Sequence, residues 1–312
     1  MNIYTDSISF ADELLDESLT WRPVNISQTD LDPGRDSLFL RFFGRRPFFQ
    51  AESENWEDWQ AAFLVEWADQ SHYDLLVDLS RTESALLDKI LCLAGSGSHC
   101  HGQRGRPWIA LPGNLHLTVS FTPMRRIEGF GSGFPALAAV SVIQTLDEIE
   151  SIEKKASIKW VNDVLINDAK VAGFLAHGQS KDSVVSCAIL GIGLNVTQSP
   201  DIKSDPFVPK AAALSSFSSD KKGCSQKEIL RKLLVHLNEN YNSLLDIGAA
   251  PLVEFYKERS GIMGRNVRIF SDPLEGEPEL IAAGKILDIG ENLELYLEGE
   301  KKPVSRGRLI LD

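Results

Sequence analysis

The chain has 312 residues, 43% of them hydrophobic and 24% charged, and its formal net charge is −12 at pH 7. This composition is typical of a globular protein with a sizeable core and two or three domains. The acidic excess argues against nonspecific binding to nucleic acid. No apolar run reaches about 18 residues, so no membrane span is predicted.

The start of the chain and its cysteines indicate a cytoplasmic protein. Residues 1–15 lack the basic and apolar regions of a secretory signal. The cysteines are sparse and have no CxxC spacing, which predicts a reducing compartment and argues against a zinc site. They are Cys92, Cys100, Cys187 and Cys224. The cluster His99-Cys100-His101 is dense, but one patch makes a poor metal cage, so we expect no metal site built from side chains alone.

Residues 1–70 form an acidic, aromatic-rich segment with five arginines, no lysine and 14 acidic residues. The run "ENWEDWQAAFLVEWADQ" predicts a helix with five apolar residues on one face. These are Trp56, Trp59, Phe63, Leu64 and Trp67. That face either packs on the rest of the protein, which we expect, or docks a partner.

The next run, "YDLLVDLSRTESALLDKI", predicts a strand followed by a helix. Alternation of Leu75, Val77 and Leu79 favours the strand. Thr82 is the predicted cap of the helix. That helix would carry Leu86, Leu87 and Ile90.

The middle of the chain alternates between apolar strands and helices. "LHLTVSF" predicts a strand, "FPALAAVSVIQTLDEI" a mostly buried helix, and "VVSCAILGIGLNV" an apolar strand. "SIKWVNDVLINDAKVAGFLAHG" predicts a hairpin with Asn167 and Asp168 near its turn. "QKEILRKLLVHLNENYNSLLDIG" predicts an amphipathic helix with an apolar stripe. The stripe consists of Ile229, Leu233, Leu237, Tyr241 and Leu244.

The sequence pattern changes near Gly264. From there on, short apolar strands separated by Gly, Pro, Asn and Asp predict a small β-barrel. We therefore expect three parts: an N-terminal extension (1–70), a catalytic domain (71–263) and a small C-terminal domain (264–312). The expected fold class is α+β, with a mixed sheet and flanking helices in the catalytic domain.

Glycines and arginines gather between residues 95 and 106, in a stretch that we call the glycine-arginine loop. Its glycines let backbone N–H groups converge on an anion, and its arginines add forked charged donors. They are Gly95, Gly97, Gly102, Gly105, Arg104 and Arg106. The order matches neither a P-loop nor a GxGxxG turn that opens a helix. The loop either binds a carboxylate or phosphate or is a surface loop with two solvated arginines.

A second polar group lies in "KWVNDVLINDAKVAG". It consists of Lys159, Asn162, Asp163, Lys170 and Gly173. Together, the two groups make the chain from about residue 73 to its end resemble bacterial biotin protein ligases (biotin–[acetyl-CoA-carboxylase] ligases), within the biotin/lipoate ligase superfamily. "CHGQRGRPWIALPGNL" is similar to the family's GRGRxGRxW and Pro-Gly-Asn-Leu turn, "KWVND" to KWPND, "KVAGFL" to KxAGIL, and "GIGLN" to GxGxN. The family's Ser-Thr-Asn is matched weakly by Arg81-Thr82-Glu83.

The resemblance implies a catalytic domain like those of class II synthetases, followed by an SH3-like barrel. It implies an ATP- and Mg-dependent enzyme that adenylates biotin to biotinyl-5'-AMP, releases pyrophosphate, and transfers biotin to a lysine. The partner would be the biotin carboxyl carrier domain of a biotin-dependent carboxylase, with no nucleic acid or membrane involved. A homodimer is compatible with the resemblance.

The resemblance also assigns roles to single residues. Lys170 and Arg106 would be catalytic. Biotin and its adenylate would be bound by Thr82, Gly102, Gln103, Arg104, Gly105, Arg106, Trp108, Gly113, Asn114, Lys170 and Gly173. The ATP and magnesium side would be formed by Lys159, Asn162, Asp163 and Asn195.

The sequence departs from the family motifs at several positions of the loop. Cys100-His101 replaces the first Gly-Arg, Gln103 replaces the next arginine, and Val161 replaces the proline of KWPND. Two other functions therefore stay open: a lipoate- or octanoate-protein ligase, and a catalytically weakened homologue that binds a ligand or a carrier. The family's DNA-binding repressor form does not fit residues 1–70, because they carry no lysine and are acidic.

Overall fold

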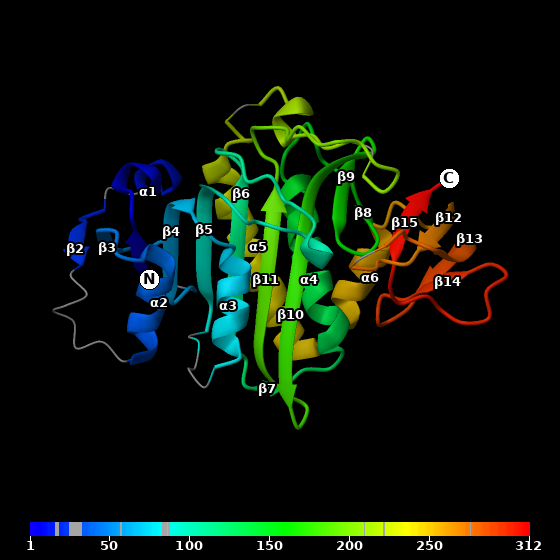
Figure 1. Ribbon diagram of the computed structural model, residues 1–312, viewed down its shortest axis with the longest axis horizontal. Helices are drawn as coiled ribbons and strands as arrows, with labels where there is room; N and C mark the ends of the chain where they lie inside the picture. The colour runs from blue at the N-terminus through cyan, green and yellow to red at the C-terminus, as the bar shows by residue number, and fades with distance from the viewer. Residues whose placement is uncertain are drawn as a thin grey trace.

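The computed structural model describes residues 1–15, 19–24, 33–56, 58–82, 86, 88–208, 210–220, 222–274 and 276–312. Within these residues, one mixed sheet of 11 strands forms the centre of the molecule (Figure 1). Its strands are β1 (Asn2–Thr5), β2 (Arg22–Val24), β3 (Phe48–Glu52), β4 (Ala61–Ala68), β5 (Ile90–Gly97), β6 (Leu115–Phe121), β7 (Arg125–Arg126), β8 (Ala156–Lys159), β9 (Asp163–Ile166), β10 (Ala169–Lys181) and β11 (Val184–Leu194).

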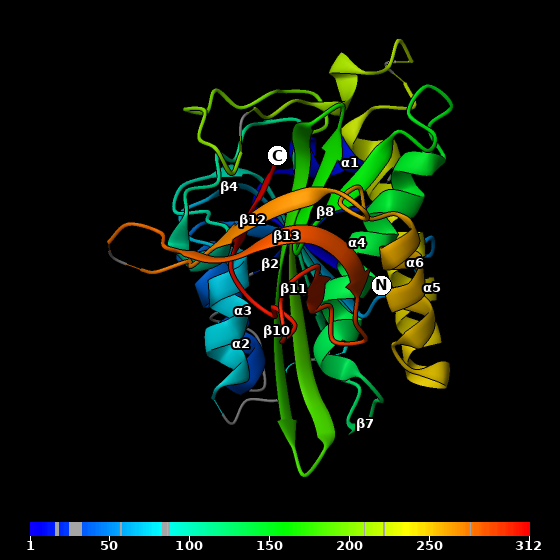
Figure 2. The ribbon, with the colours of Figure 1, turned by 90° about the vertical axis from the view of Figure 1, so that its right-hand side faces the viewer.

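The strand order is β2-β3-β1-β4-β5-β6-β11-β10-β9-β8, and β7 pairs with β11. The strands β1, β4 and β5 run parallel to one another, and the remaining pairs are antiparallel. Helices cover both faces, as the edge-on view in Figure 2 shows. They are α1 (Ile8–Leu14), α2 (Pro33–Phe43), α3 (His72–Ser80), α4 (Phe130–Asp147), α5 (Gln226–Ile247) and α6 (Ala250–Glu258).

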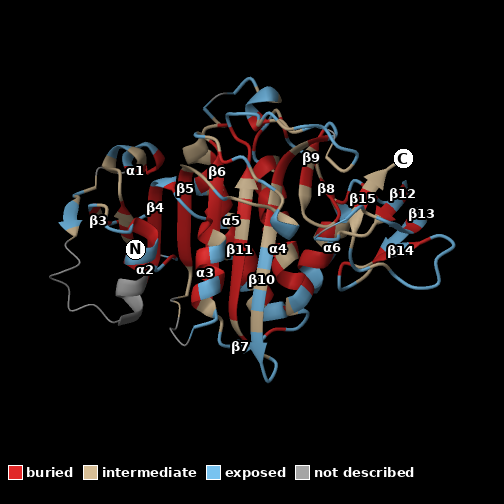
Figure 3. Ribbon diagram, viewed as in Figure 1, coloured by how far each residue is buried: buried red, intermediate tan, exposed pale blue. Residues whose placement is uncertain are grey.

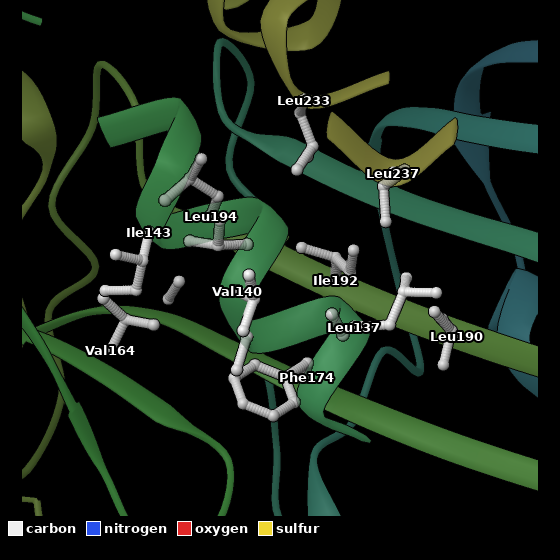
Figure 4. Packing of buried hydrophobic residues seen from close by; sticks show 14 of the residues in the cluster. Leu137, Val140, Ile143, Val164, Phe174, Leu190, Ile192, Leu194, Leu233 and Leu237 are labelled. Carbon is white, nitrogen blue, oxygen red and sulfur yellow. The ribbon is translucent and has the colours of Figure 1, made fainter. Parts of the chain in front are cut away.

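The helix α4 shields the middle of the main sheet from solvent. It is apolar on all sides, and 13 of its 18 residues are buried, as expected for a helix enclosed by other elements. Figure 4 shows Leu137, Val140 and Ile143 among residues of β11 such as Ile192, with Leu233 of α5 nearby. Figure 3 shows the result as buried strands at the centre, while the far end of β10 is exposed.

The elements predicted between residues 115 and 247 are confirmed. The strand β6, the helix α4, the β9–β10 hairpin, the strand β11 and the helix α5 all form where the pattern places them. Asn167 and Asp168 form the hairpin turn with positive φ angles of 49° and 60°. The predicted apolar stripe of α5 is buried along its whole length.

The C-terminal strands form a four-stranded antiparallel sheet in the order β14-β13-β12-β15, which confirms a small β domain there. The strands are β12 (Asn266–Phe270), β13 (Leu280–Ile289), β14 (Leu295–Leu297) and β15 (Arg308–Leu311). This sheet shares the hydrophobic core of the main sheet, and the indole of Trp160 donates a hydrogen bond to the carbonyl of Leu293 at 2.6 Å. Together with the main sheet and its helices, the small sheet confirms the α+β class.

The helix predicted over Trp56 to Trp67 is wrong. Trp56 and Trp59 lie in turns before β4, and the following residues pair in parallel with β5. Both faces of β4 are covered, so it appears in the sequence as a continuous apolar run, which periodicity does not separate from a helix. The segment 1–70 therefore extends the main sheet by β1 to β4. The division of the chain at residues 70 and 263 stays a proposal.

The strand and helix predicted over residues 73–90 are also wrong. Residues 72–80 form α3, whose N-cap Ser71 accepts a hydrogen bond from the amide of Asp74 at 3.3 Å. Thr82 follows the end of this helix, and its hydroxyl donates to the carbonyl of Leu79 in the last turn of α3. Ile90 begins the strand β5, and the predicted positions Glu83 and Leu87 lie outside the described residues.

No helix in the described parts of the chain combines the length and the apolar character needed to cross a membrane.

Burial of the N-terminal aromatic residues generates a stability prediction. Phe43 is fully buried and stacks on Phe48 with ring centroids 4.6 Å apart. We expect Phe43→Ala to lower the free energy of unfolding by about 3–5 kcal/mol, because it leaves a cavity, as measured by urea denaturation. Leu40 of the same helix is 50% exposed, so Leu40→Ala should cost no more than about 0.5 kcal/mol. Equal losses in the two variants would contradict the packing described here.

Candidate functional site

A cavity of about 520 Å³ lies beside α3, on the same face of the main sheet as that helix. This volume is within the usual range for small-molecule sites. The strands β6, β11 and β10 form its floor, and α3 closes one end. The hairpin after β5, the segment 200–208 and the start of β15 close the remaining sides.

Glycines make the floor flat enough for large side chains to lie on it. A Cβ atom at Gly193 would lie 2.4 Å from the Trp108 indole, and one at Gly191 would lie 3.1 Å from the Tyr73 ring. A Cβ at Gly173 would lie 3.1 Å from the Lys170 ammonium. These three positions therefore need glycine because of close packing, not because of a turn.

Trp108 is held in place by a buried histidine. Its indole N–H donates to Nδ1 of His116 at 3.2 Å, and Nε2 of His116 lies 3.0 Å from the carbonyl of Leu111. Nδ1 must accept and Nε2 must donate, so His116 is the neutral Nε2–H tautomer. Burial lowers the pKa of His116, although the Leu111 carbonyl acts in the opposite direction.

Two lysines and a carboxylate occupy the end of the cavity near the C-terminal sheet. The ammonium of Lys170 lies 2.6 Å from Oδ1 of Asp163 and 5.7 Å from the centre of the Trp108 ring. Lys159 is buried and donates a hydrogen bond to the carbonyl of Phe207. Burial lowers the pKa of Lys159, with Asp163 acting in the opposite direction. This end is suited to binding an anion.

The segment 200–208 is fixed over this end by the C-terminal sheet. The guanidinium of Arg308 stacks on the Phe207 ring at 3.7 Å, and Phe270 meets the same ring edge-on at 5.7 Å. A stacked arginine contributes a permanent charge to the wall of the cavity.

The glycine-arginine loop is shorter than predicted. Gly95 and Gly97 belong to β5, where a Cβ at Gly97 would lie 2.5 Å from the carbonyl oxygen of Ala68. These two glycines therefore permit close pairing with β4. Farther along the loop, Arg106 faces the cavity and pairs with Asp272 of the C-terminal domain at 2.6 Å.

Two buried polar atoms at the cavity have no hydrogen-bond partner: Oδ1 of Asn195 and Nδ1 of His72. Asn195 is 1% exposed and His72 is 6% exposed. Burial lowers the pKa of His72 to about 3, so its ring is neutral. The N-terminal segment supports this ring, because Phe42 meets it edge-on at 4.9 Å. A buried polar atom without a partner is costly unless a ligand supplies the missing hydrogen bond.

The structure brings most of the predicted site residues to the cavity. Those that line it are Gly102, Gln103, Arg106, Trp108, Lys159, Asn162, Asp163, Lys170, Gly173 and Asn195. Those outside its lining are Thr82, Arg104, Gly105, Gly113 and Asn114.

Asn114 has a different task from the one implied by the resemblance. Its Oδ1 accepts hydrogen bonds from the amides of Val196, Thr197 and Gln198 at 2.9, 3.1 and 3.0 Å. It therefore fixes the chain that leaves β11. Asn162 similarly uses its amide N–H to bind the Phe174 carbonyl at 2.9 Å, which holds the β9–β10 hairpin beside the cavity.

Several residues of the cavity were not predicted from the sequence. They are Ser71, His72, Tyr73, His116, Thr118, Phe207 and Arg308. Two signals were available for some of them. "SHYD" has the Ser-x-x-Asp spacing of a helix start, and the polar residues of "LHLTVSF" alternate with the apolar ones. Neither Phe207 nor Arg308 has such a signal, because their position depends on how the C-terminal sheet packs.

No group of three or more His, Cys, Asp or Glu side chains that could hold a metal ion occurs among the residues that the structure describes.

Comparison with known families gives a match to this part of the chain. Residues 70–195 match the biotin/lipoate A/B protein ligase family. A bifunctional ligase/repressor BirA from Bacillus subtilis (strain 168) is 26% identical over 63% of this chain and 61% of its own length. The corresponding protein of Bacillus spizizenii is 28% identical, over 64% of this chain and 56% of its own length. The chain thus spans about three fifths of the length of these two relatives.

Other relatives match over more of their length. A biotin–[acetyl-CoA-carboxylase] ligase from Mycobacterium tuberculosis is 24% identical over 81% of this chain and 89% of its own length. Among solved structures, a biotin protein ligase from Aquifex aeolicus in complex with biotin and ATP superimposes with a TM-score of 0.62. It is 24% identical, and the match covers 80% of this chain and 98% of that chain. This likeness shows a shared fold.

The buried, neutral His72 predicts how stability depends on pH. The pKa of His72 is about 3 in the folded protein and about 6.5 in the unfolded chain. Between these values the unfolded chain binds a proton that the folded protein does not, so stability falls as the pH decreases below about 6.5. From pH 7 to pH 5, we expect the wild type to lose about 2 kcal/mol more than His72→Gln does, by urea denaturation at each pH.

The exposed His99 supplies the control. His99→Gln should follow the wild type at every pH. If His72→Gln also followed the wild type, the assignment of a neutral ring at His72 would be wrong.

Proposed function

We propose that the chain is an ATP-dependent biotin protein ligase, on the premise that residues 70–195 match the biotin/lipoate A/B protein ligase family. It adenylates biotin with release of pyrophosphate and then transfers the biotinyl group to a lysine of a biotin carboxyl carrier domain. The observation that carries this proposal is the pair of Lys170 and Asp163 beside Trp108, at the cationic end of a cavity large enough for a small acid.

The first step brings two anions together. The biotin carboxylate attacks the α-phosphorus of ATP, a new bond forms between carboxylate oxygen and phosphorus, and pyrophosphate leaves. At about 4 Å, the repulsion of two unit charges is about 4 kcal/mol at an effective dielectric near 20. Lys170, Lys159 and Arg106 all face the cavity, and fixed cations of this kind offset the repulsion without reorganising.

The second step is attack on the mixed anhydride by an amine. The lysine nitrogen of the carrier domain forms an amide bond with the biotinyl carbon, AMP leaves with the electron pair of the broken C–O bond, and the amine gives up a proton. Nothing at the cavity orients His101 toward this amine, because both of its ring nitrogens are engaged with other partners. Catalysis in this step therefore depends on positioning.

The nucleotide is assigned to the end of the cavity near Asn195 and the two lysines. Oδ1 of Asn195 lacks a donor, and the 6-amino group of adenine would provide one. Magnesium enters with ATP. The carboxylate of Asp163, which is 15% exposed, is the kind of oxygen ligand that magnesium prefers, so the residues at this end fit the metal–nucleotide complex.

The end of the cavity opposite the two lysines favours biotin over lipoate and octanoate, the other acids considered. Ser71, His72 and Thr118 line it, and Nδ1 of His72 has no partner. The apolar tail of octanoate and the dithiolane of lipoate offer no strong hydrogen bond there, whereas the ureido group of biotin offers donors and an acceptor. Lys170, Asp163 and Arg106 are all present at the cavity. Their presence argues against a catalytically weakened homologue that only binds a ligand or a carrier.

The proposal includes a cytoplasmic location, since all four cysteines are free thiols and such thiols persist in a reducing compartment. The carrier domain of a biotin-dependent carboxylase is the protein substrate. The resemblance implies no nucleic acid or membrane partner, and a homodimer is compatible with it.

The role of Lys170 is tested by replacing it. We expect Lys170→Ala to lower biotin-dependent release of pyrophosphate from MgATP by roughly 10²–10³-fold, as for the loss of one preorganised donor. Lys181→Ala, at the exposed far end of the same strand, is the matched control and should keep the wild-type rate. Biotin, lipoate and octanoate are offered separately. Release with another acid alone would reassign the substrate, and a normal rate in Lys170→Ala would remove Lys170 from the mechanism.

The assignment of Asn195 to adenine predicts nucleotide selectivity. ITP carries a carbonyl oxygen where ATP has the 6-amino group, so the wild type should have a KM for ITP about tenfold above that for ATP, for the loss of a buried hydrogen bond. In Asn195→Leu the two KM values should converge, while binding of biotin alone, by calorimetry, stays unchanged. Undiminished discrimination by Asn195→Leu would place adenine elsewhere.

A further inference from the structure

The residues that depart from the family motif form a hairpin at the edge of the cavity. We call residues 100–108 the loop hairpin. The amide of Gly102 donates to the carbonyl of Arg106 at 2.7 Å, and the amide of Trp108 donates to the carbonyl of Cys100 at 3.0 Å. His101 forms a β-bridge with Pro107 between these two bonds. The shape of the loop hairpin is therefore set by its own backbone, and its position over the cavity depends on what its side chains contact.

His101 connects the loop hairpin to α3. Its Nε2 lies 2.7 Å from Oδ2 of Asp74, and its Nδ1 lies 2.9 Å from the carbonyl oxygen of Gly102. A carbonyl and an ionised carboxylate can only accept hydrogen bonds, so both ring nitrogens must donate. Only the doubly protonated imidazolium has two N–H donors. The geometry of these contacts is therefore that of a charged histidine.

The other groups that face this imidazole do not change charge near neutral pH. On α3, burial and then Asp74 raise the pKa of Tyr73 to about 12. In the loop hairpin, burial and then Asp74 raise the pKa of the Cys100 thiol. Arg106 is permanently charged and is paired with Asp272 on the side of the C-terminal sheet. Any change of charge at this contact therefore comes from the imidazole or from its carboxylate partner.

We propose that His101 and Asp74 form a positioning pair that fastens the loop hairpin to α3 at the wall of the cavity, and that the ring makes both of its hydrogen bonds, to Asp74 and to the Gly102 carbonyl, only while the imidazole is doubly protonated. The proposal rests on the proposed function, because its consequence is a pH-dependent affinity for the acid. His101 is a positioning residue here. It acts through the loop hairpin, which places Gln103 and Arg106 at the cavity.

The direction of the pH effect follows from the partners of the ring. Burial lowers the pKa of His101, but the hydrogen bonds to the Gly102 carbonyl and the Asp74 carboxylate outweigh burial, and the pKa is raised above its ordinary value. A raised pKa means that the fastened loop binds the proton more tightly than the released loop. The fastening is therefore strongest below the raised pKa and weakens as the pH rises through it, because the neutral ring keeps only one of its two N–H donors.

The kinetic test measures KM for biotin and kcat for pyrophosphate release at about pH 6.5 and about pH 9. In the wild type, KM should rise about fivefold with pH while kcat changes by less than about twofold, because the pair is partly exposed to solvent. His101→Gln and Asp74→Asn should show the higher KM at both pH values. His101→Arg keeps a charge and two donors at either pH, so it should keep the low KM at both.

A second histidine–carboxylate contact, outside the cavity lining, provides the matched control. Nε2 of His236 lies 2.6 Å from Oε1 of Glu148, close to the 2.7 Å of the proposed pair. His236→Gln should reproduce the wild-type KM and its pH dependence. If His101→Gln behaved like His236→Gln at both pH values, the positioning role would be refuted while the ligase function stood.

A measurement without substrates separates the two proposals. Amide hydrogen exchange of the loop hairpin is compared in His101→Gln and His236→Gln at the same pH, so that intrinsic exchange rates cancel. We expect exchange about fivefold faster in His101→Gln at about pH 6.5, and equal rates at about pH 9. Equal exchange rates in the two variants at both pH values would contradict the proposed role of the His101–Asp74 pair. If the wild type released no pyrophosphate with biotin, the proposed function would fail, and exchange would still decide whether His101 fastens the loop.

Discussion

Contact between the Trp108 indole and the backbone of β11 at Gly193 is the constraint on which the cavity depends. Any larger residue at Gly193 would place a carbon 2.4 Å from the ring. The indole in turn engages His116 and lies beside the Lys170 ammonium. One aromatic side chain at the end of the loop hairpin thereby links the loop to the floor and to the lysine that faces the anion. Because the floor is a sheet buried on its other side by α4, this geometry has little freedom to relax.

The parts of the fold that the sequence predicts well are those with unambiguous local signals. The β9–β10 hairpin has its Asn-Asp turn, and α5 has a long amphipathic stripe. Residues 56–80 give misleading signals. The strand β4 is covered on both faces, so its apolar run lacks alternation, and the short run of α3 fits period 2 as well as period 3.6. The Ser71 cap favours the helix. Pairing of β4 with β5 is a long-range contact that no local pattern contains.

Residues of the candidate site that belong to ordered sequence motifs were predictable. Residues that reach the cavity only through tertiary packing were not. Lys170, Asp163 and Trp108 come together at the cavity as the motif order implies. Asn114 is different: its carboxamide caps the amides that follow β11, a role that a Pro-Gly-Asn turn does not reveal. Arg308 reaches the cavity only because the C-terminal sheet packs beside the segment 200–208, so its position depends on tertiary structure alone.

Transfer of biotin to a carrier domain is the central claim, and intact-mass measurement tests it most directly. The full chain is incubated with MgATP, an equal mixture of biotin and lipoate, and an isolated biotin carboxyl carrier domain. We expect the carrier to gain the mass of one biotinyl group, on its lysine, and omission of ATP to abolish the gain. A carrier of unchanged mass, or one that gains a lipoyl group, would contradict this claim.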